Sequence, residues 1–223
     1  MEQILKNAIK RGQKSLSEYE SKAVVKSAGV AITSEKLARS REEATTFAEE
    51  IGYPVALKGC SATLAHKTEA GVVKLNLADA KAVRDAYDEI TGRVSEIDGV
   101  LVQEMIKGSR EFVIGLTRDP QFGPCVMFGI GGIFTEAIKD VSFRIAPLTE
   151  EDAEEMIEEI KMKKLLGGFR GSPAVDRSEL VRALVGIGEL ALRHSEIAEI
   201  DINPLIIAGN KPVAADALII LAG

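Results

Sequence analysis

A strand with polar residues at every second position lies near the C-terminus, in the segment Glu199-Ile200-Asp201-Ile202-Asn203-Pro204-Leu205. Because strand side chains alternate between the two faces of a sheet, we expect Glu199, Asp201 and Asn203 to point to one face. Pro204 has no N–H to donate to a sheet ladder, so the strand is predicted to end or turn there. The segment therefore requires a sheet with one apolar face and one polar face.

A second apolar run, Val213 to Leu221, contains Asp216. If the two runs lie side by side, Asp216 comes close to Asn203. Carboxylate and amide oxygens gathered at one point suit Mg²⁺, which keeps several waters and takes further ligands from substrate phosphates. The pattern points to nucleotide-dependent phosphoryl transfer. A half-buried strand with a solvated polar face explains the same spacing equally well.

Composition excludes several classes of protein. The 223 residues allow one large domain or two small lobes, and 46% apolar content argues against disorder. The net charge of −6, without a basic patch interleaved with aromatic residues, makes nucleic acid an unexpected partner. The apolar runs are too short to span a membrane, and the N-terminus does not resemble a signal peptide. Cys60 and Cys125 match no metal-binding spacing, so we expect reduced thiols in a cytoplasmic protein.

Helices alternate with strands in the first half of the chain, which predicts an α/β fold. The second half instead has two adjacent strands, a glycine cluster, an acidic helix beginning after Thr149 and a long helix beginning after Asp176. The change falls near Lys107-Gly108-Ser109, where we predict a hinge between two lobes. The expected parts are an N-terminal helical segment, an N-terminal lobe and a C-terminal lobe, at residues 1–20, 21–106 and 107–223.

Two candidate nucleotide contacts lie at strand ends in the first lobe. Lys58 ends an apolar strand before a loop of small residues, where a lysine can reach a phosphate, although an ordinary strand-terminal lysine fits better when taken alone. The segment Gln103-Glu104-Met105-Ile106 ends another strand. Its backbone could pair with a purine edge while the apolar side chains cover the base. The alternative is a strand that simply leaves the core.

Other candidates lie outside that lobe or in loops. Glu111 begins a strand and could contact a ribose or a second Mg²⁺, or could be a solvated edge residue. Gly131 and Gly132 could form an anion-binding nest, although turn glycines are the common explanation. Arg144 stands between apolar residues and requires a phosphate or carboxylate partner. His66 could accept a phosphoryl group, whereas a lone loop histidine is more often a surface residue.

Several segments together resemble one family. The chain resembles the ATP-grasp β subunit of ADP-forming acetyl-CoA synthetases, relatives of succinyl-CoA synthetase. The match covers nearly the whole chain. It departs from the family where Gly71-Val72 stands in place of two glycines. The matching segments, in chain order, are YPVALK at 53–58, HKTEAGV at 66–72, VQEM at 102–105, EFVIG at 111–115, FGIGGIFTE at 128–136 and EIDINPL at 199–205.

The resemblance implies an ATP-grasp fold, in which two α/β lobes hold ATP or ADP and Mg²⁺ between them. The reaction implied is acyl-CoA + ADP + phosphate ⇌ acid + CoA + ATP, through an acyl phosphate and a phosphohistidine on a CoA-binding α subunit, in an α2β2 assembly. A stand-alone carboxylate ligase of the same fold and a nucleotide-binding regulatory module are the alternatives. The implied site residues are His66 and Arg144 for catalysis, Lys58, Gln103, Glu104, Met105, Ile106, Glu111, Gly131 and Gly132 for the nucleotide, and Asn203, Asp216 and Asp201 for the metal.

Overall fold

The computed structural model describes residues 1–62, 71–94, 97–132, 140–168 and 171–222. The chain forms two compact units. The N-terminal unit comprises residues 16–19 and 33–106, and the C-terminal unit comprises residues 1–15, 20–32 and 107–223. The division between 106 and 107 lies at the position where the sequence predicts a hinge, whereas residues 20–32 belong with the C-terminal unit. Within the described ranges, no helix combines the length and the apolar character that a membrane crossing requires.

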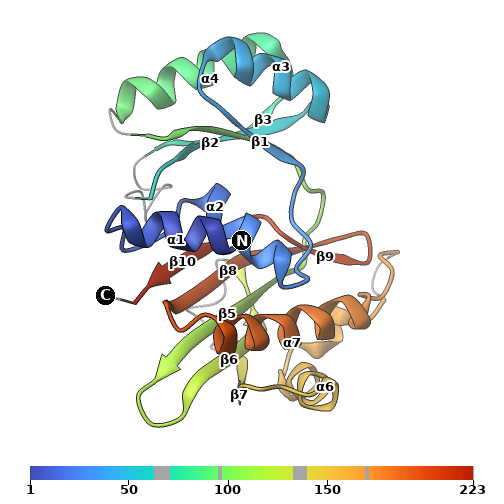
Figure 1. Ribbon diagram of the computed structural model, residues 1–223. Coiled ribbons are helices and arrows are strands. Elements are labelled where there is room, and N and C mark those ends of the chain that lie inside the picture. The colour runs from blue at the N-terminus through green and yellow to red at the C-terminus, as the bar shows by residue number, and fades with distance from the viewer. Residues whose placement is uncertain (63–70, 95–96, 133–139, 169–170, 223) are drawn as a thin grey trace. The chain divides into compact units, whose positions relative to one another are not determined.

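The N-terminal unit is a four-stranded antiparallel sheet with two helices on one face (Figure 1). Val55, Leu57, Val100 and Val102 form its core together with side chains of the two helices. The strands, in the spatial order β1-β4-β2-β3, are β1 (Glu35–Ala38), β4 (Gly99–Glu104), β2 (Val55–Cys60) and β3 (Val73–Leu77), and the helices are α3 (Arg41–Ile51) and α4 (Ala80–Arg93).

Local sequence signals account for the ends of these two helices. Ser40 caps α3 by accepting a hydrogen bond from the backbone N–H of Glu43, and Asp79 caps α4 in the same way through Ala82. Helix α3 stops at Gly52, whose φ of 95° suits glycine. Capping therefore fixes where each helix begins, and the buried apolar face of the sheet fixes how each one packs.

The C-terminal unit is built on a six-stranded sheet with strand order β10-β8-β5-β6-β7 and β9 beside β8. Helices α6 and α7 contact one face of this sheet through β5, β6 and β7. The strands are β5 (Glu111–Asp119), β6 (Gly123–Ile130), β7 (Val141–Ile145), β8 (Ile197–Ala208), β9 (Lys211–Ala214) and β10 (Leu218–Leu221). The helices are α1 (Glu2–Lys10), α2 (Glu18–Ser27), α6 (Glu150–Glu159), the short η2 (Lys163–Leu166) and α7 (Arg177–Arg193).

The strand is predicted to end or turn at Pro204. It does not end there, because β8 continues to Ala208. The strand accommodates the proline with an irregularity in its pairing to β5. Phe112 pairs with Leu205 and Ile114 pairs with Ile202, so Asn203 and Pro204 together lie opposite a single residue. A bulge of this kind removes the need for a ladder N–H at proline and re-aims the neighbouring side chain.

Candidate functional site

The polar face of β8 carries the acidic part of the candidate site. Ile200 and Ile202 are buried, whereas Glu199 and Asp201 are exposed and Asn203 is half-buried, as the alternation predicts. The β9–β10 connection carries the second carboxylate, Asp216. Its position is fixed by Ala215, whose N–H donates to the carbonyl of Pro204 at 3.0 Å.

Asp201 and Asp216 interact electrostatically. Burial of the carboxyl group, and secondly the charge of Asp216, raise the pKa of Asp201 to about 6. The residue as a whole is nevertheless exposed to solvent. Two carboxylates that repel each other at one position would be stabilised together by a divalent cation.

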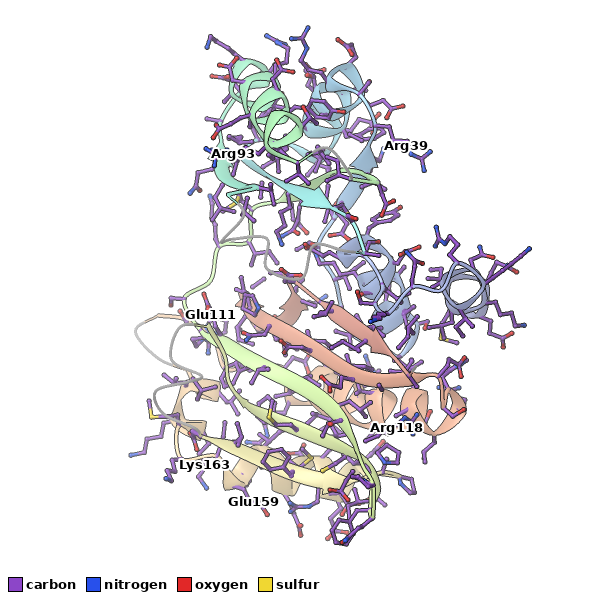
Figure 2. All side chains as sticks on the ribbon, turned by 90° about the vertical axis from the view of Figure 1, so that its left-hand side faces the viewer. Arg39, Arg93, Glu111, Arg118, Glu159 and Lys163 are labelled. Carbon is purple, nitrogen blue, oxygen red and sulfur yellow. The ribbon has the colours of Figure 1, made fainter. Side chains whose placement is uncertain are left out.

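The third predicted metal ligand, Asn203, lies beside the glycine pair. Its Oδ1 accepts a hydrogen bond from the N–H of Gly132 at 3.1 Å. The N–H of Gly131 donates to the carbonyl of Glu111 at 2.9 Å. A Cβ atom on Gly132 would lie 2.0 Å from Oε2 of Glu111, so that carboxylate rests against the glycine. The structure thus brings together four of the predicted residues at the beginning of β5, where Figure 2 shows Glu111.

The donor set fits a hard cation. Asp201 and Asp216 supply carboxylate oxygens and Asn203 supplies an amide oxygen, which are the donors that Mg²⁺ prefers. Among the residues that the structure describes, no three His, Cys, Asp or Glu side chains form a metal-binding group. Two carboxylates with one amide suit a cation that takes its remaining ligands from water and phosphate rather than from a closed protein cage.

In the N-terminal unit, Lys58 is a buried cation on β2. Its Nζ donates to Oε1 of Glu18 at 2.7 Å, and the two side chains are only 9% and 0% exposed. A buried charge of this kind needs an opposite charge, because desolvation alone would cost several kcal/mol. No local pattern in the sequence indicates that Glu18 pairs with Lys58, so this role was missed.

The end of β4 is tied to the backbone of residue 34. Oε1 of Glu104 accepts a hydrogen bond from the N–H of Ser34 at 2.6 Å, and the N–H of Glu104 donates to the carbonyl of Ser34 at 3.0 Å. Gln103 is buried, and Met105 and Ile106 follow the strand as half-buried residues. The carboxylate of Glu104 is therefore engaged locally, while the segment after it offers apolar side chains.

Of the two predicted catalytic residues, the structure describes Arg144 but not His66. Arg144 on β7 donates to the carboxylates of Glu155 and Glu159 on α6 at 3.0 and 2.6 Å. These hydrogen bonds raise its pKa, and they supply the carboxylate partner that the sequence requires. The second residue, His66, lies outside the described residues.

Sequence reasoning also missed Arg110, which precedes Glu111. Its buried guanidinium donates hydrogen bonds of 2.9 to 3.2 Å to four backbone carbonyls, those of Leu165, Gly167, Pro173 and Gly209. Arg110 therefore ties the beginning of β5 to the end of η2 and to the β8–β9 turn. The only signal in the sequence is a charged residue directly before an apolar strand.

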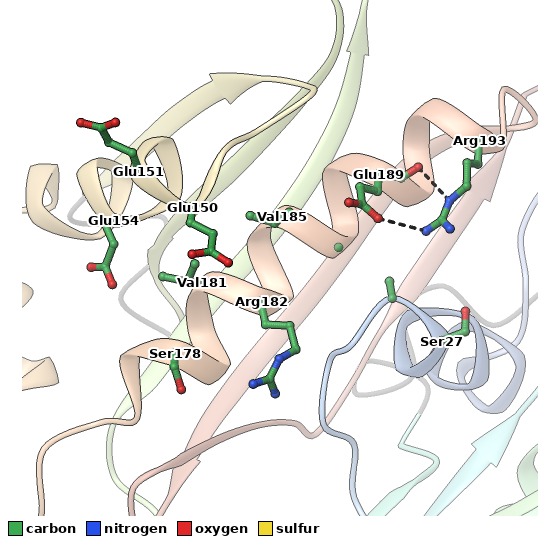
Figure 3. Close-up of a pocket in the computed structure, with 12 residues that line it drawn as sticks. Ser27, Glu150, Glu151, Glu154, Ser178, Val181, Arg182, Val185, Glu189 and Arg193 are labelled. Carbon is green, nitrogen blue, oxygen red and sulfur yellow. Dashed lines mark hydrogen bonds and ion pairs between the residues drawn. The ribbon is translucent and has the colours of Figure 1, made fainter.

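A groove of about 660 Å³ lies elsewhere in the C-terminal unit (Figure 3). Its walls come from the end of α2, the beginning of α6 and the outer side of α7, and they include the ion pair between Glu189 and Arg193. None of the sequence-predicted site residues lines it. The groove therefore provides no support for the nucleotide site.

Comparison with known proteins places this geometry in a family. A model described as an ATP-grasp domain matches residues 7–221. The β subunit of acetate–CoA ligase [ADP-forming] I from Pyrococcus furiosus is 45% identical over 212 residues, which cover 92% of this chain and 91% of that protein. The chain belongs to the ATP-grasp family, among the β subunits of ADP-forming acetate–CoA ligases. The resemblance drawn from the sequence and the ATP-grasp fold are both confirmed.

Solved structures of this family extend the match over the whole chain. The acetyl-coenzyme A synthetase 1 of Ca. Korarchaeum cryptofilum, in complex with coenzyme A, Ca-AMPCP and HgCl+, has a TM-score of 0.94 and 48% identity, with 99% of each chain covered. A second structure of that synthetase holds coenzyme A and Mg-AMPPCP, and its phosphohistidine segment points towards the nucleotide binding site. It has a TM-score of 0.87 and 47% identity, again over 99% of each chain.

Proposed function

We propose that this chain is the nucleotide-binding β subunit of an ADP-forming acetyl-CoA synthetase. The overall reaction converts acyl-CoA, ADP and phosphate to the acid, CoA and ATP, through an acyl phosphate and a phosphohistidine. The observation that carries the proposal is the set of oxygen donors at Asp201, Asn203 and Asp216, found in a chain that matches this family over nearly its whole length.

Each unit contributes groups suited to a nucleoside diphosphate. Lys58 supplies a positive charge, and its pairing with Glu18 holds that charge in place until a phosphate competes for it. The segment from Gln103 to Ile106 offers backbone groups and apolar side chains to a purine. Asp201, Asn203 and Asp216 would hold Mg²⁺, which when bound offsets phosphate charge. Phosphoryl transfer needs positioning and charge neutralisation more than covalent chemistry from this subunit.

The phosphoryl group would arrive on a histidine of a CoA-binding α subunit. The N–P bond of the phosphohistidine breaks as an oxygen of the ADP β-phosphate bonds to phosphorus. The N–P electron pair stays on the ring nitrogen, and the ring leaves as neutral imidazole because it takes up one proton from solvent. The N–H groups of Gly131 and Gly132 donate to the Glu111 carbonyl and to Oδ1 of Asn203, so these glycines would bind an anionic group only if those hydrogen bonds are exchanged for bonds to it. We also propose an α2β2 assembly and a relay role for His66, which rest on the resemblance.

The test is ATP synthesis from acetyl-CoA, ADP, phosphate and Mg²⁺ by the chain alone and by the chain with its companion α subunit. We expect activity only with the companion. Labelled phosphate from ATP should appear on histidine, and the His66→Ala variant separates a label on this chain from a label on the companion. Activity of the chain alone with an amine acceptor would indicate a stand-alone ligase. Nucleotide binding without transfer in either preparation would indicate a regulatory module.

A further inference from the structure

The open face of the six-stranded sheet carries an apolar patch that the proposed nucleotide site does not use. The patch consists of Cys125, Met127, Phe143 and Ile145. Met127 pairs with Phe143, and Cys125 pairs with Ile145, as direct neighbours on β6 and β7. Phe143 and Ile145 expose 49% and 48% of their surface, and the other two residues are half-buried. Four contiguous side chains of this kind are more than scattered surface apolar residues.

The register places this patch on the same face as Asp201. Phe143 pairs with Met127, Met127 with Gly115, and Gly115 with Asp201, in one row across β7, β6, β5 and β8. Directly paired residues point to the same face of a sheet. With neighbouring strands about 4.8 Å apart, the row runs roughly 14 Å from the exposed phenylalanine to the proposed metal ligand.

The adjacent row across the same four strands also runs from an exposed apolar residue to a polar residue of β8. Ile145 pairs with Cys125, Cys125 with Thr117, and Thr117 with Glu199. The patch is therefore continuous with the polar stripe of β8. The alternate residues point the other way: Arg144 binds glutamates of α6, and a Cβ on Gly188 of α7 would lie 3.6 Å from Val126. Helices contact that opposite face, whereas the patch keeps its solvent exposure.

Strand β7 also lies at the edge of the sheet, which leaves the apolar patch more accessible. Strand β7 is the last strand in the sheet order, and in the part of the chain that the structure describes no further strand pairs with its outer side. Exposed apolar residues on an edge strand are a liability for a protein on its own, because they favour association. A protein that works with a macromolecular partner can place such residues where the partner binds.

We propose that this apolar patch is a docking surface for the phosphohistidine-bearing segment of the companion subunit, an inference that rests on the proposed function. The phosphoryl carrier must approach the face that bears Asp201 and Asn203. A carrier bound to the helix-covered face would have to pass around the edge of the sheet. In the Korarchaeum synthetase the phosphohistidine segment points towards the nucleotide binding site.

The size of the patch favours this occupant over a second copy of the chain. A stable interface buries about 800 Å² on each partner, which is roughly 20 or more residues. Four apolar side chains supply only a small part of that area. They suit a reversible contact with one segment, which binds while the phosphoryl group is delivered and then leaves.

Cys125 provides a native reporter for the docking experiment. The chain has two cysteines, of which Cys60 is fully buried and Cys125 is partly accessible. Burial, and secondly the charge of Asp119, raise the pKa of the Cys125 thiol, so alkylation by N-ethylmaleimide is best followed at pH 8. We expect saturating companion subunit to slow Cys125 alkylation at least tenfold, with Cys60 as the internal reference.

The matched variant is the double substitution Phe143→Ser with Ile145→Ser, and the control is Leu75→Ser, an exposed leucine of the N-terminal unit. We expect the double variant to raise the Kd for the companion at least tenfold, to bind ADP within twofold of the wild type and to keep its melting temperature. The control should match the wild type in all three measurements.

Three results would overturn the docking proposal: unprotected Cys125 in the saturated complex, wild-type affinity of the double variant, or protection that appears with the chain alone as its concentration rises. The last result would assign the patch to self-association. A wild-type complex that assembles and protects Cys125 but makes no ATP from acetyl-CoA would instead contradict the proposed function. The two failures are thus distinguishable.

Discussion

Nζ of Lys58 donates a hydrogen bond to Oε1 of Glu18 at 2.7 Å, in a position where both side chains are almost inaccessible to solvent. The pair joins the middle of a sheet strand to the first residue of α2. Because removing one partner takes an ion-pair contact from the other buried charge, the pair is a structural element as well as a candidate phosphate site.

The first prediction is that Glu18 contributes mainly to stability and Lys58 to ADP binding. We expect Glu18→Ala to lower the free energy of unfolding by up to about 3–5 kcal/mol, because it removes an ion-pair partner from a buried lysine. Glu18→Gln should cost less and should retain ADP binding, whereas Lys58→Met should weaken ADP binding at least tenfold. Urea unfolding and calorimetric titration with ADP measure the two effects.

A surface pair supplies the control for this experiment. Lys36 and Glu50 form an ion pair with both side chains about half exposed, so Glu50→Gln should change the free energy of unfolding by about 1 kcal/mol or less. An equal loss of stability in Glu18→Ala and Glu50→Gln would contradict the structural role of Glu18. Full ADP affinity in a folded Lys58→Met variant would remove Lys58 from the site.

The second prediction compares two glycines with the same backbone conformation. Gly132 and Gly209 have φ values of 67° and 64°, but only at Gly132 does an added Cβ meet another group, at 2.0 Å from Oε2 of Glu111. Gly209→Ala should cost about 1 kcal/mol for its left-handed backbone. Gly132→Ala should cost a similar amount, because the clashing Oε2 is the far end of a flexible side chain that can move away. It should, however, displace the Glu111 carboxylate and lower ATP synthesis at least tenfold.

Thermal unfolding and ATP synthesis of the two alanine variants test whether the Glu111 carboxylate rests against Gly132. The double variant Gly132→Ala with Glu111→Ala should be as stable as Gly132→Ala alone and should remain impaired in ATP synthesis. Equal ATP synthesis by the two glycine variants would show that the Glu111 carboxylate does not rest on Gly132 in solution.

Periodicity and capping signals in the sequence predict much of this fold. Thr149 and Asp176 cap helices that begin where expected. The alternation from Glu199 to Asn203 appears on one face of β8. These features depend on residues close in sequence, so the local pattern contains the required information.

What the sequence could not provide depends on contacts between distant segments. The bulge that carries β8 past Pro204 arises from pairing with β5, which is about 90 residues earlier in the chain. The partners of Arg110 lie 55 to 99 residues away. The pairing of Lys58 with Glu18 spans 40 residues. No local pattern signals these contacts, which is why the structural roles of Glu18 and Arg110 were not predicted.

The third prediction concerns the proposed metal ligands. Asn203→Ala and Asp216→Asn should each lower acetyl-CoA-dependent ATP synthesis by about two to three orders of magnitude, as expected when charge stabilisation at the transferred group is lost. The melting temperature should change little for Asp216→Asn, because the substitution also reduces the repulsion that raises the pKa of Asp201.

The control for the metal ligands is Glu199→Gln, an exposed residue on the same face of β8. It should retain ATP synthesis within about threefold. Chelation of Mg²⁺ should abolish activity of the wild type, and excess Mg²⁺ should partly restore the Asp216→Asn variant. Wild-type turnover by Asn203→Ala at limiting Mg²⁺ would remove Asn203 from the metal site.

The fourth prediction concerns Arg144, which the family resemblance implies as a catalytic residue but which pairs with Glu155 and Glu159 in the structure. Its row in the sheet also holds Val126, on the face that α6 and α7 contact. We therefore expect Arg144→Met to keep ATP synthesis within about twofold of the wild type. The free energy of unfolding should fall by no more than about 1 kcal/mol, because both glutamates are half exposed.

The pH dependence of that loss follows from Glu159. The hydrogen bond from Arg144 lowers the pKa of Glu159 in the folded chain, so the pair stabilises the fold above the ordinary glutamate pKa of about 4.3. The stabilisation disappears as the pH falls through the lowered value and the carboxylate becomes protonated. Urea unfolding should show a smaller Arg144→Met difference at pH 3 than at pH 7. A tenfold loss of ATP synthesis with unchanged stability at pH 7 would return Arg144 to the catalytic site.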